Sequence, residues 1–389
     1  MARLVTVLPL YCTGTAVTYT CLSLVEHMRP FGAEPEVWVP TAVGAGRRPW
    51  VREAVPSQLR SIAYRLVDEP AILRLMEKRA LASLREGDWV YTYPGVSLGF
   101  LETATQRGIR VVAERINCAE ATCDRVVRAE TERLGWEPDA ILDGEVLRLK
   151  RERAELALCD HVFAPNPLVR KSLEEINVDP RRIIDTSYGF DPARLTGSSR
   201  AAPEFEGLTL AFVGLSCIRK GIHLLFEALA RTSVPIRLLL AGGVSKTIEK
   251  ECAATLAKPN VVRLGFVSDV GSVYRSADVF VFPSLEEGGP MVTYEAMSLG
   301  KPVVVSPMGA GAIARDGVDG FVIPPHDVDR MAAAFDQLWR EPELRRAMGA
   351  SALERAKDFT WEKVGKRRQA SLEALASFSR VPLPPIPQR

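Results

Sequence analysis

Short runs of β-branched and other apolar residues alternate along the chain with longer segments whose apolar residues recur at helical spacing. This alternation is typical of parallel sheets covered by helices on both faces, because buried parallel strands consist of continuous apolar runs. In the first half, strands are predicted at 3–9, 36–39, 88–93, 109–113, 160–164 and 182–186. Val17, Cys21, Leu24 and Met28 recur at the spacing of one helix face, which predicts a helix between the first two strands.

A second strand-and-helix series follows a stretch rich in Gly, Ser, Ala and Pro at 192–207, which predicts an interdomain linker. Its strands are predicted at 208–213, 236–241, 261–264, 279–282 and 303–305, and its last helices near 327–340, 342–357 and 361–378. The predicted fold class is α/β, with two doubly wound domains that face a cleft. We assign the domains to 1–187 and 188–360, and we expect 361–389 to form a helix that packs back on the first domain, followed by a Pro-rich tail.

Composition excludes several classes of protein. The 389 residues are 47% hydrophobic and 25% charged, which excludes a disordered or fibrous chain. Lys and Arg number 50 against 48 Asp and Glu, for a net charge of +2. A nucleic-acid coat or a strongly anionic-membrane-binding protein needs a concentrated positive field, so we expect no nucleic-acid partner.

The cysteines and an uncharged stretch near the amino terminus indicate where in the cell the protein is expected to work. The seven cysteines include no Cys-x-x-Cys pair and no Cys/His ligand spacing, so we expect reduced thiols in a cytoplasmic protein and no metal site. Residues 4–25 carry no charge, but they contain Pro9, Gly14 and several hydroxyl side chains. Burying these groups in a bilayer is costly, so we expect a strand, a turn and a helix rather than stable membrane insertion.

The most informative segment is 278–309. A buried strand leads into a loop with paired carboxylates, Gly288 and Gly289, and a helix follows from about Pro290 until Gly300 ends it. Proline suits a first helical turn, and the two glycines are expected to let a ligand approach backbone N–H groups at the positive helix end. The segment therefore predicts a site for an anion and hydroxyl groups together.

Glu287 and Glu295 lie on either side of this helix start. The segment resembles the signature of retaining, nucleotide-sugar-dependent glycosyltransferases of family 4, the glycogen-synthase and sucrose-synthase type, in which two glutamates separated by seven residues bracket a glycine-rich turn. The resemblance implies the GT-B fold, two Rossmann-like domains with the acceptor side first and the donor side second. It also implies that Glu287 contacts the donor sugar, that Glu295 holds the ribose, and that Met291 and Val292 line the donor. A solvated acidic loop with a helix-facing ion pair is the alternative.

A second element joins Gly214, after a predicted strand, to Arg219 and Lys220 at the opening of a helix. Two cations at a helix start can neutralise a diphosphate through charge-assisted hydrogen bonds. In the resembled family, the lysine that matches Lys220 binds the donor diphosphate, usually with an arginine just after the earlier glycine. Leu215 stands at that place, so Arg219 is expected to supply the second charge. Surface cations at a helix end are the alternative.

Three further positions match donor-side loops of the resembled family. Gly14 follows the first predicted strand, where the family packs a glycine-rich turn against the donor phosphates and the acceptor, and the neighbouring Thr13 is assigned to the acceptor. Gly242 and Val267 match loops on the nucleoside side. Backbone groups usually meet the base there, so the side chains do not identify the base; UDP is the donor nucleotide that we expect. Read alone, Gly14 is a turn residue.

The chain departs from the family after the strand predicted at 109–113. The family commonly has a histidine near the donor sugar there, whereas this loop contains Glu114, Asn117 and Glu120. We predict that at least one of the three contacts acceptor hydroxyls; helix capping and surface salt bridges are the alternative. The loop at 306–314 also lacks the acidic residue that the family often has.

These residues predict a retaining hexosyltransferase with Glu287, Lys220 and Arg219 in the catalytic site. The two cations stabilise the leaving diphosphate, and the resemblance implies that the phosphate itself takes the acceptor proton, without metal or cofactor. Glu114, Glu120 and Asp124 favour a small cationic acceptor such as an aminocyclitol in aminoglycoside antibiotic biosynthesis. The alternatives are a glycosyltransferase of cell-surface polysaccharide or glycolipid synthesis, a sugar-nucleotide epimerase, and a degenerate sugar-nucleotide-binding protein.

Overall fold

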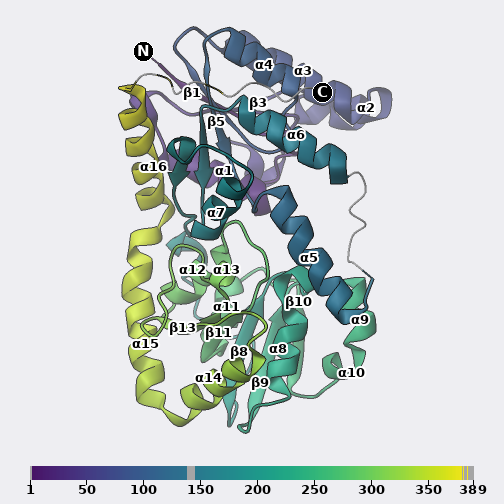
Figure 1. Cartoon of the computed structure of the whole chain (residues 1–389), viewed down its shortest axis with the longest axis vertical. Helices are drawn as coiled ribbons and strands as arrows, with labels where there is room; N and C mark the ends of the chain where they lie inside the picture. The colour runs from purple at the N-terminus through teal and green to yellow at the C-terminus, as the bar shows by residue number, and fades with distance from the viewer. Residues whose placement is uncertain (1, 138–144, 379, 381–382, 384–389) are drawn as a thin grey trace.

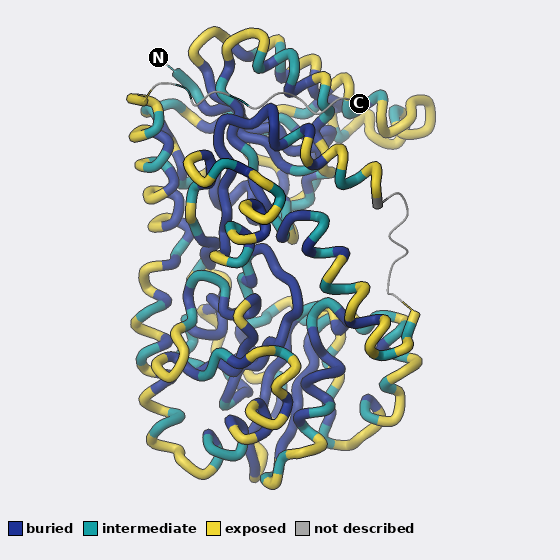
Figure 2. Tube along the Cα trace, viewed as in Figure 1, coloured by how far each residue is buried: buried dark blue, intermediate teal, exposed yellow. Residues whose placement is uncertain are grey.

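The computed structural model describes residues 2–137 and 145–378, together with 380 and 383. Two parallel sheets, each flanked by helices, follow one another along the long axis of the molecule (Figure 1). The central strands of both sheets are buried, whereas most exposed residues lie on the outer turns of the helices and on the loops (Figure 2). This arrangement confirms the predicted α/β fold with two Rossmann-like domains. None of the helices in the described part of the chain is long and apolar enough to cross a bilayer.

The first sheet has seven strands in the order β3-β2-β1-β4-β5-β6-β7. They are β1 (Leu4–Val7), β2 (Glu36–Val39), β3 (Val51–Glu53), β4 (Trp89–Thr92), β5 (Arg110–Glu114), β6 (His161–Ala164) and β7 (Ile183–Asp185). All six predicted strands are present. The edge strand β3 was not predicted because its three residues, Val-Arg-Glu, form no apolar run.

Seven helices accompany this sheet in the described residues. They are α1 (Ala16–His27), α2 (Arg60–Leu66), α3 (Glu69–Ser83), α4 (Leu98–Gln106), α5 (Glu120–Leu134), α6 (Glu145–Ala157) and α7 (Pro167–Glu175). Helix α1 buries Cys21, Leu24 and Met28, as its spacing predicted. Gly14 precedes it with φ 73°, and a Cβ there would lie 2.6 Å from the backbone of Ala45, so only glycine fits.

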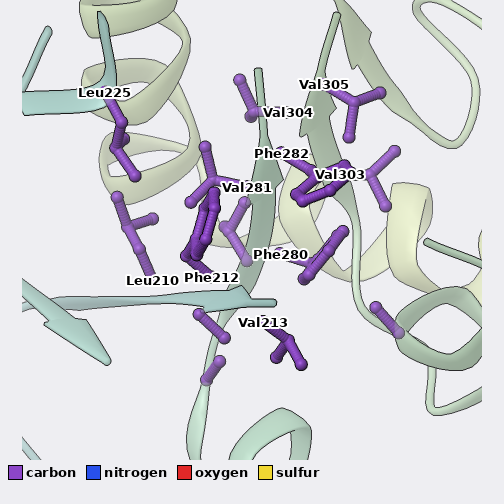
Figure 3. Close-up of a cluster of buried hydrophobic side chains, with 14 of the residues drawn as sticks. Leu210, Phe212, Val213, Leu225, Phe280, Val281, Phe282, Val303, Val304 and Val305 are labelled. Carbon is purple, nitrogen blue, oxygen red and sulfur yellow. The ribbon is translucent and has the colours of Figure 1, made fainter. Parts of the chain in front are cut away.

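The second sheet has six strands in the order β10-β9-β8-β11-β12-β13. They are β8 (Leu208–Val213), β9 (Ile236–Ala241), β10 (Val261–Gly265), β11 (Val279–Phe282), β12 (Val303–Val305) and β13 (Gly320–Val322). The five predicted strands are present, and β13 was missed because a glycine begins a strand of only three residues. Phe212, Phe280 and Phe282 pack between β8, β11 and β12 in the core of this domain (Figure 3).

The helices of the second half are α8 (Ile222–Leu229), α9 (Lys246–Glu251), α10 (Ala253–Leu256), α11 (Val270–Ser276), α12 (Met291–Ser298), α13 (Pro307–Ala310), α14 (Val328–Arg340), α15 (Pro342–Ala356) and α16 (Trp361–Ala376). The last three correspond to the three helices predicted near the end of the chain. Most of the predicted Pro-rich tail lies outside the described residues.

The stretch predicted as a linker is packed against the second domain. Leu195 and Ala202 are buried in its core, the amide of Ala201 donates to the Ser272 carbonyl at 3.1 Å, and Ser199 Oγ donates to Asp269 at 2.7 Å. The residues from 192 to 207 therefore run over α11 instead of forming a free connection, which corrects the prediction drawn from their Gly, Ser and Ala content.

Two crossovers between the domains, near Phe190 and near Phe359, are paired. The amide of Phe190 donates to the Phe359 carbonyl at 3.1 Å, and the amide of Trp361 donates back to the Phe190 carbonyl at 3.1 Å. Gly189 makes this approach feasible, since a Cβ there would lie 2.7 Å from the Phe359 oxygen. Beyond the second crossover, α16 runs beside α1 of the first domain (Figure 1).

Candidate functional site

The predicted site is built where β8 and β11 end. Both strands are fully buried in the parallel sheet, so the loops that follow them leave its carboxyl edge together. The loop after β11 leads to Pro290, which is the residue before α12 rather than its first helical residue. The loop after β8 forms a short 3-10 turn, Ile218–Lys220, closed by Gly221 with φ 67°. A Cβ on Gly221 would lie 2.1 Å from the Pro283 carbonyl, so glycine lets the two loops touch.

Lys220 and Glu287 meet at this junction. The ammonium of Lys220 contacts a carboxylate oxygen of Glu287, and the two side chains are only 14% and 9% exposed. Burial lowers the pKa of Lys220 to about 7, and the neighbouring charge of Arg219 acts in the same direction. The structure therefore brings together the residue predicted to bind the diphosphate and the residue predicted to bind the sugar.

Arg219 is held by Glu286, a residue that the sequence did not single out. The Arg219 guanidinium donates to a Glu286 carboxylate oxygen at 3.0 Å and to the Glu286 carbonyl at 3.1 Å. The other Glu286 carboxylate oxygen accepts from the backbone amide of Cys118 in the first domain at 2.8 Å. Glu286 is fully buried, so it fixes Arg219 and links the two domains. The only sequence signal was its place beside Glu287.

Glu295 lies on α12, one turn beyond the loop. The hydroxyl of Tyr274 donates to its carboxylate at 2.9 Å. Burial raises the pKa of Glu295, whereas the Tyr274 hydrogen bond and the charge of Arg194 oppose that rise. Arg194 itself lies over the Tyr19 ring of the first domain at 4.3 Å. A buried carboxylate held by one hydroxyl donor retains a free oxygen that can accept from another hydroxyl.

Gly288 and Gly289 pack closely against neighbouring segments. A Cβ at Gly288 would lie 1.8 Å from the Ile116 carbonyl, and one at Gly289 would lie 2.4 Å from the Tyr188 ring. The two glycines thus allow Ile116 and Tyr188 to approach the loop closely. Their predicted backbone contact with a ligand stays a prediction. Met291, the first residue of α12, accepts a hydrogen bond from Thr20 of α1 at 3.4 Å.

The glycines on the nucleoside side differ from one another. Gly214 has φ 136°, and a Cβ there would meet only Phe282, at 4.0 Å. Gly242, with φ 120°, packs against Gly214, whose carbonyl would lie 2.2 Å from a Cβ. Val267 is half-buried, whereas the preceding Phe266 is 92% exposed, which the sequence reading did not anticipate. Val292 on α12 packs against the core of the second domain.

The four residues predicted for the acceptor make different contacts. Thr13 lies beside Gly14, with its hydroxyl hydrogen-bonded to that of Thr15 at 2.7 Å. Asn117 adjoins the Gly288 contact through its backbone. Glu120 begins α5, where its backbone amide donates to Glu152 at 3.0 Å, and burial raises the pKa of its carboxyl group.

Glu114 corrects the acceptor prediction. Both its side chain and that of Arg368 are fully buried, and the two form a bidentate ion pair with distances of 2.7 and 3.2 Å. The adjoining cavity has a volume of about 20 Å³, enough for one water molecule. The carboxylate therefore anchors α16 to β5 and does not face an acceptor. Asp124 is likewise paired, with Arg148 at 2.7 Å.

A larger pocket of about 600 Å³ adjoins Gly14. It lies between α1, the crossover segment at 190–194 and the start of α16, and its walls include Tyr19, Arg48, Arg194 and Trp361. Of the residues that the sequence assigned to the site, Gly14 is the one that lines this pocket in the described part of the chain. Among the described residues, no group of three or more His, Cys, Asp or Glu side chains is arranged to hold a metal ion.

Comparison with protein families finds a match in the second domain. Residues 201–355 match the family described as glycosyl transferases group 1. The matched segment lies within the second domain. It carries Lys220, Glu287 and Glu295. The match supports the resemblance drawn from the 278–309 segment.

Curated relatives are similar to part of this chain. A D-inositol 3-phosphate glycosyltransferase of Thermobifida fusca is 31% identical over 240 residues, which is 55% of this chain and 55% of the relative. One of the same description from Kribbella flavida is 34% identical over 193 residues, 44% of this chain and 45% of the relative. The chain spans about half the length of the curated relatives it matches.

Solved structures extend the likeness to the whole fold. A sucrose-phosphate synthase from Thermosynechococcus elongatus superposes with a TM-score of 0.73 over 96% of this chain and 99% of its own, at 18% identity. HepE of Anabaena, solved with UDP and glucose, gives a TM-score of 0.67 over 96% and 100%, at 15% identity. These likenesses confirm the predicted GT-B fold.

Proposed function

We propose that the chain is a retaining glycosyltransferase that moves a hexose or amino-hexose from a nucleoside-diphosphate sugar, with UDP preferred, to a hydroxyl of a small acceptor. The observation that carries the proposal is the contact between Lys220 and Glu287 at the carboxyl edge of a group 1 glycosyltransferase sheet. In a nucleoside-diphosphate sugar the diphosphate and the sugar are adjacent. Lys220 and Glu287, which are predicted to bind these two groups, are in contact as well.

The donor's arrival changes the partners of Lys220. A diphosphate competes with Glu287 for the Lys220 side chain and favours its protonated form, because it supplies more negative charge than one carboxylate. Glu287 is then free to accept hydrogen bonds from sugar hydroxyls. Lys220 and the Arg219 that Glu286 holds stabilise the charge on the leaving phosphate, and Glu295 binds the ribose. The leaving phosphate takes the acceptor proton, so no metal or cofactor enters the scheme.

The acceptor is proposed to enter beside Thr13 and Gly14, where the 600 Å³ pocket gives room for a small polyhydroxylated molecule. An aminocyclitol belongs to this class of acceptor. Glu114 and Asp124 are paired with arginines, so their negative charges give less support to a cationic acceptor than the sequence suggested. The curated relatives are named for inositol 3-phosphate, and Arg48 and Arg194 in the pocket wall suit such a phosphorylated acceptor. All seven cysteines are unpaired thiols, which supports the proposal that the protein works in the cytoplasm.

The test follows nucleoside diphosphate release from a panel of nucleotide sugars, with and without aminocyclitol and inositol phosphate acceptors. Release that depends on an acceptor, with retention at the anomeric carbon, supports the proposal. Sugar isomerisation without acceptor would instead indicate an epimerase, and donor binding without turnover would indicate a degenerate binding protein. Transfer to a polysaccharide or lipid acceptor alone would contradict a small acceptor.

Matched variants locate the site. Glu287→Gln and Lys220→Ala should each lower turnover by two orders of magnitude or more, as expected for groups that stabilise developing charge (about 10²–10³). Glu204→Gln and Lys258→Ala change exposed side chains of the same domain and should retain the wild-type rate. Wild-type rates in both site variants would refute the assignment.

A further inference from the structure

A second pocket lies on the other side of the paired crossovers. Its volume is about 640 Å³, and its walls come from Thr186 and Ser187 in the first crossover, from the end of α15 and from α16. Figure 1 shows α15 and α16 running along one edge of the molecule, with the break between them at the level where the two domains meet. The pocket belongs to neither the donor site nor the pocket beside Gly14.

Most charged groups around this pocket have partners of opposite charge. Arg368 is paired with Glu114, as described above. Asp185 is paired with Arg170 of α7 at 3.2 Å, and Asp358 with Lys363 at 3.0 Å. Both carboxylates of the pocket wall are therefore already neutralised by cations from outside it.

Arg355 and Arg367 are different. Their guanidinium groups lie over the Phe359 ring at 4.8 and 5.3 Å, and each donates to a backbone carbonyl, that of Ile313 at 3.3 Å and that of Asp358 at 2.7 Å. In the described part of the chain, no carboxylate oxygen lies within 4.0 Å of either group. Burial lowers the pKa of Arg367, and the charges of Arg355 and Arg368 act in the same direction, whereas the charge of Asp358 in the pocket wall opposes them.

We propose that this pocket binds the phosphomonoester group of a small metabolite between Arg355 and Arg367. Guanidinium groups bind phosphate oxygens through paired, charge-assisted hydrogen bonds. A phosphomonoester carries about −1.5 to −2 charge near pH 7, which matches two guanidinium groups without a carboxylate partner. The volume falls within the range of about 300–1,000 Å³ typical of small-molecule pockets.

The position of the pocket gives such a ligand a regulatory use. It would contact residues on both crossovers, which are hydrogen-bonded to each other between Phe190 and Phe359. A ligand that binds one relative position of the domains better than another shifts the population toward it. The site would therefore let a phosphorylated metabolite influence how the donor and acceptor domains come together.

The experiment is calorimetric titration of the full chain with glycerol 3-phosphate, and with acetate as a carboxylate control. The Lys220→Ala chain is titrated in parallel, because it lacks the predicted diphosphate cation. Saturable binding of glycerol 3-phosphate should be equal in the wild-type and Lys220→Ala chains. It should weaken at least tenfold in Arg355→Gln and in Arg367→Gln. Arg346→Gln, an exposed arginine of α15 that pairs with Glu343, is the matched control and should bind like the wild type.

Each other outcome overturns the proposal. Unchanged affinity in both Arg355→Gln and Arg367→Gln, absence of saturable binding to the wild type, or loss of binding in Lys220→Ala alone would do so. Arg355→Lys keeps the charge and should recover part of the affinity if either glutamine variant fails to fold. Because the readout is binding in a chain without Lys220, its result is independent of whether sugar transfer is found.

Discussion

Lys220 is a buried cation whose charge depends on what surrounds it. Burial lowers its pKa to about 7, so a large part of the free protein carries a neutral lysine above that pH. A bound diphosphate favours the charged form and raises the pKa again. Nucleotide binding above pH 7 is therefore coupled to the uptake of a proton.

This coupling predicts the pH dependence of nucleotide affinity. The association constant for a nucleoside diphosphate should fall by up to about tenfold per pH unit between pH 7 and 9, because each unit makes protonation of Lys220 harder. Lys220→Arg should bind with nearly constant affinity over that range, since arginine stays charged. Titration calorimetry in buffers of different ionisation enthalpy measures both the affinity and the proton uptake. A flat profile in the wild type would contradict the low pKa.

The Glu114–Arg368 pair makes a second residue-scale prediction. Glu114→Gln leaves the Arg368 charge buried with no carboxylate partner, so we expect a loss of about 3–5 kcal/mol in the free energy of unfolding, measured by urea denaturation. At temperatures where the variant is folded, its KM for the acceptor should equal that of the wild type. Unchanged stability with a raised acceptor KM would instead support the role predicted from the sequence.

Single residues could be assigned roles from the sequence where a local motif surrounds them. Lys220, Glu287 and Glu295 each stand beside a glycine or a helix start that gives the position a recognisable role. Glu114 was assigned to the acceptor because it follows β5, yet its partner Arg368 lies far away in the sequence on α16. Periodicity and local motifs contain no information about such a distant pairing, and the same holds for the contact between Glu286 and Cys118.

At the scale of elements, the loop before α12 joins the two domains. Gly288 approaches the Ile116 carbonyl so closely that a Cβ would lie 1.8 Å from it, and Gly289 packs on Tyr188. Strands were predictable because continuous apolar runs mark buried parallel strands. The edge strands β3 and β13 were not, because three residues carry too little pattern. The close interdomain packing of a glycine loop depends on the other domain, so the sequence of the loop alone does not predict it.

Gly288→Ala tests this packing. The added methyl group requires the backbone at Ile116 to move, so we expect the free energy of unfolding to fall by about 1–3 kcal/mol, as in other overpacked sites, together with a loss of transfer activity. Gly99→Ala in α4 is the control: its Cβ would meet nothing within 4 Å, and alanine should stabilise that helix by up to about 1 kcal/mol. Equal stability of the two variants in urea denaturation would contradict the close contact.

Helix α5 forms another bridge between the domains (Figure 1). Glu130 on this helix contacts His223 of α8 at 2.6 Å and His326 at 2.7 Å, and Arg133 donates to it at 2.8 Å. Despite the opposing effect of burial, hydrogen bonds from His223, Arg133 and His326 hold the pKa of Glu130 well below its usual range. The ionised carboxylate therefore stabilises the folded chain.

The sign of this shift sets its pH dependence. Stabilisation by Glu130 is fully present above its unfolded pKa of about 4.3 and is lost as the pH falls toward the lower folded value. Glu130→Gln should lower the free energy of unfolding at pH 7 by about 1.5–3 kcal/mol, and the difference from the wild type should shrink below pH 4. Glu132→Gln, an exposed glutamate of the same helix, should have little effect. A pH-independent difference would show that the carboxylate charge is not involved.

At the scale of the whole molecule, two parallel sheets are joined by the paired crossovers and by the contacts of Glu286, Gly288 and Glu130. The crossovers pass near the predicted domain limits at 187 and 360. The fold class followed from strand and helix periodicity alone. The packing of the 192–207 stretch on α11 and the anchoring of α16 by Arg368 depend on contacts between distant segments.

The central claim is that a nucleoside-diphosphate sugar binds to the second domain at Lys220, Glu287 and Glu295. A crystal structure of the chain soaked with UDP tests it most directly. We predict diphosphate density at the Lys220 ammonium, ribose hydroxyls on Glu295, and separation of Lys220 from Glu287. Nucleotide density elsewhere, for example beside Trp361 in the 600 Å³ pocket, with Lys220 still in contact with Glu287, would contradict the account.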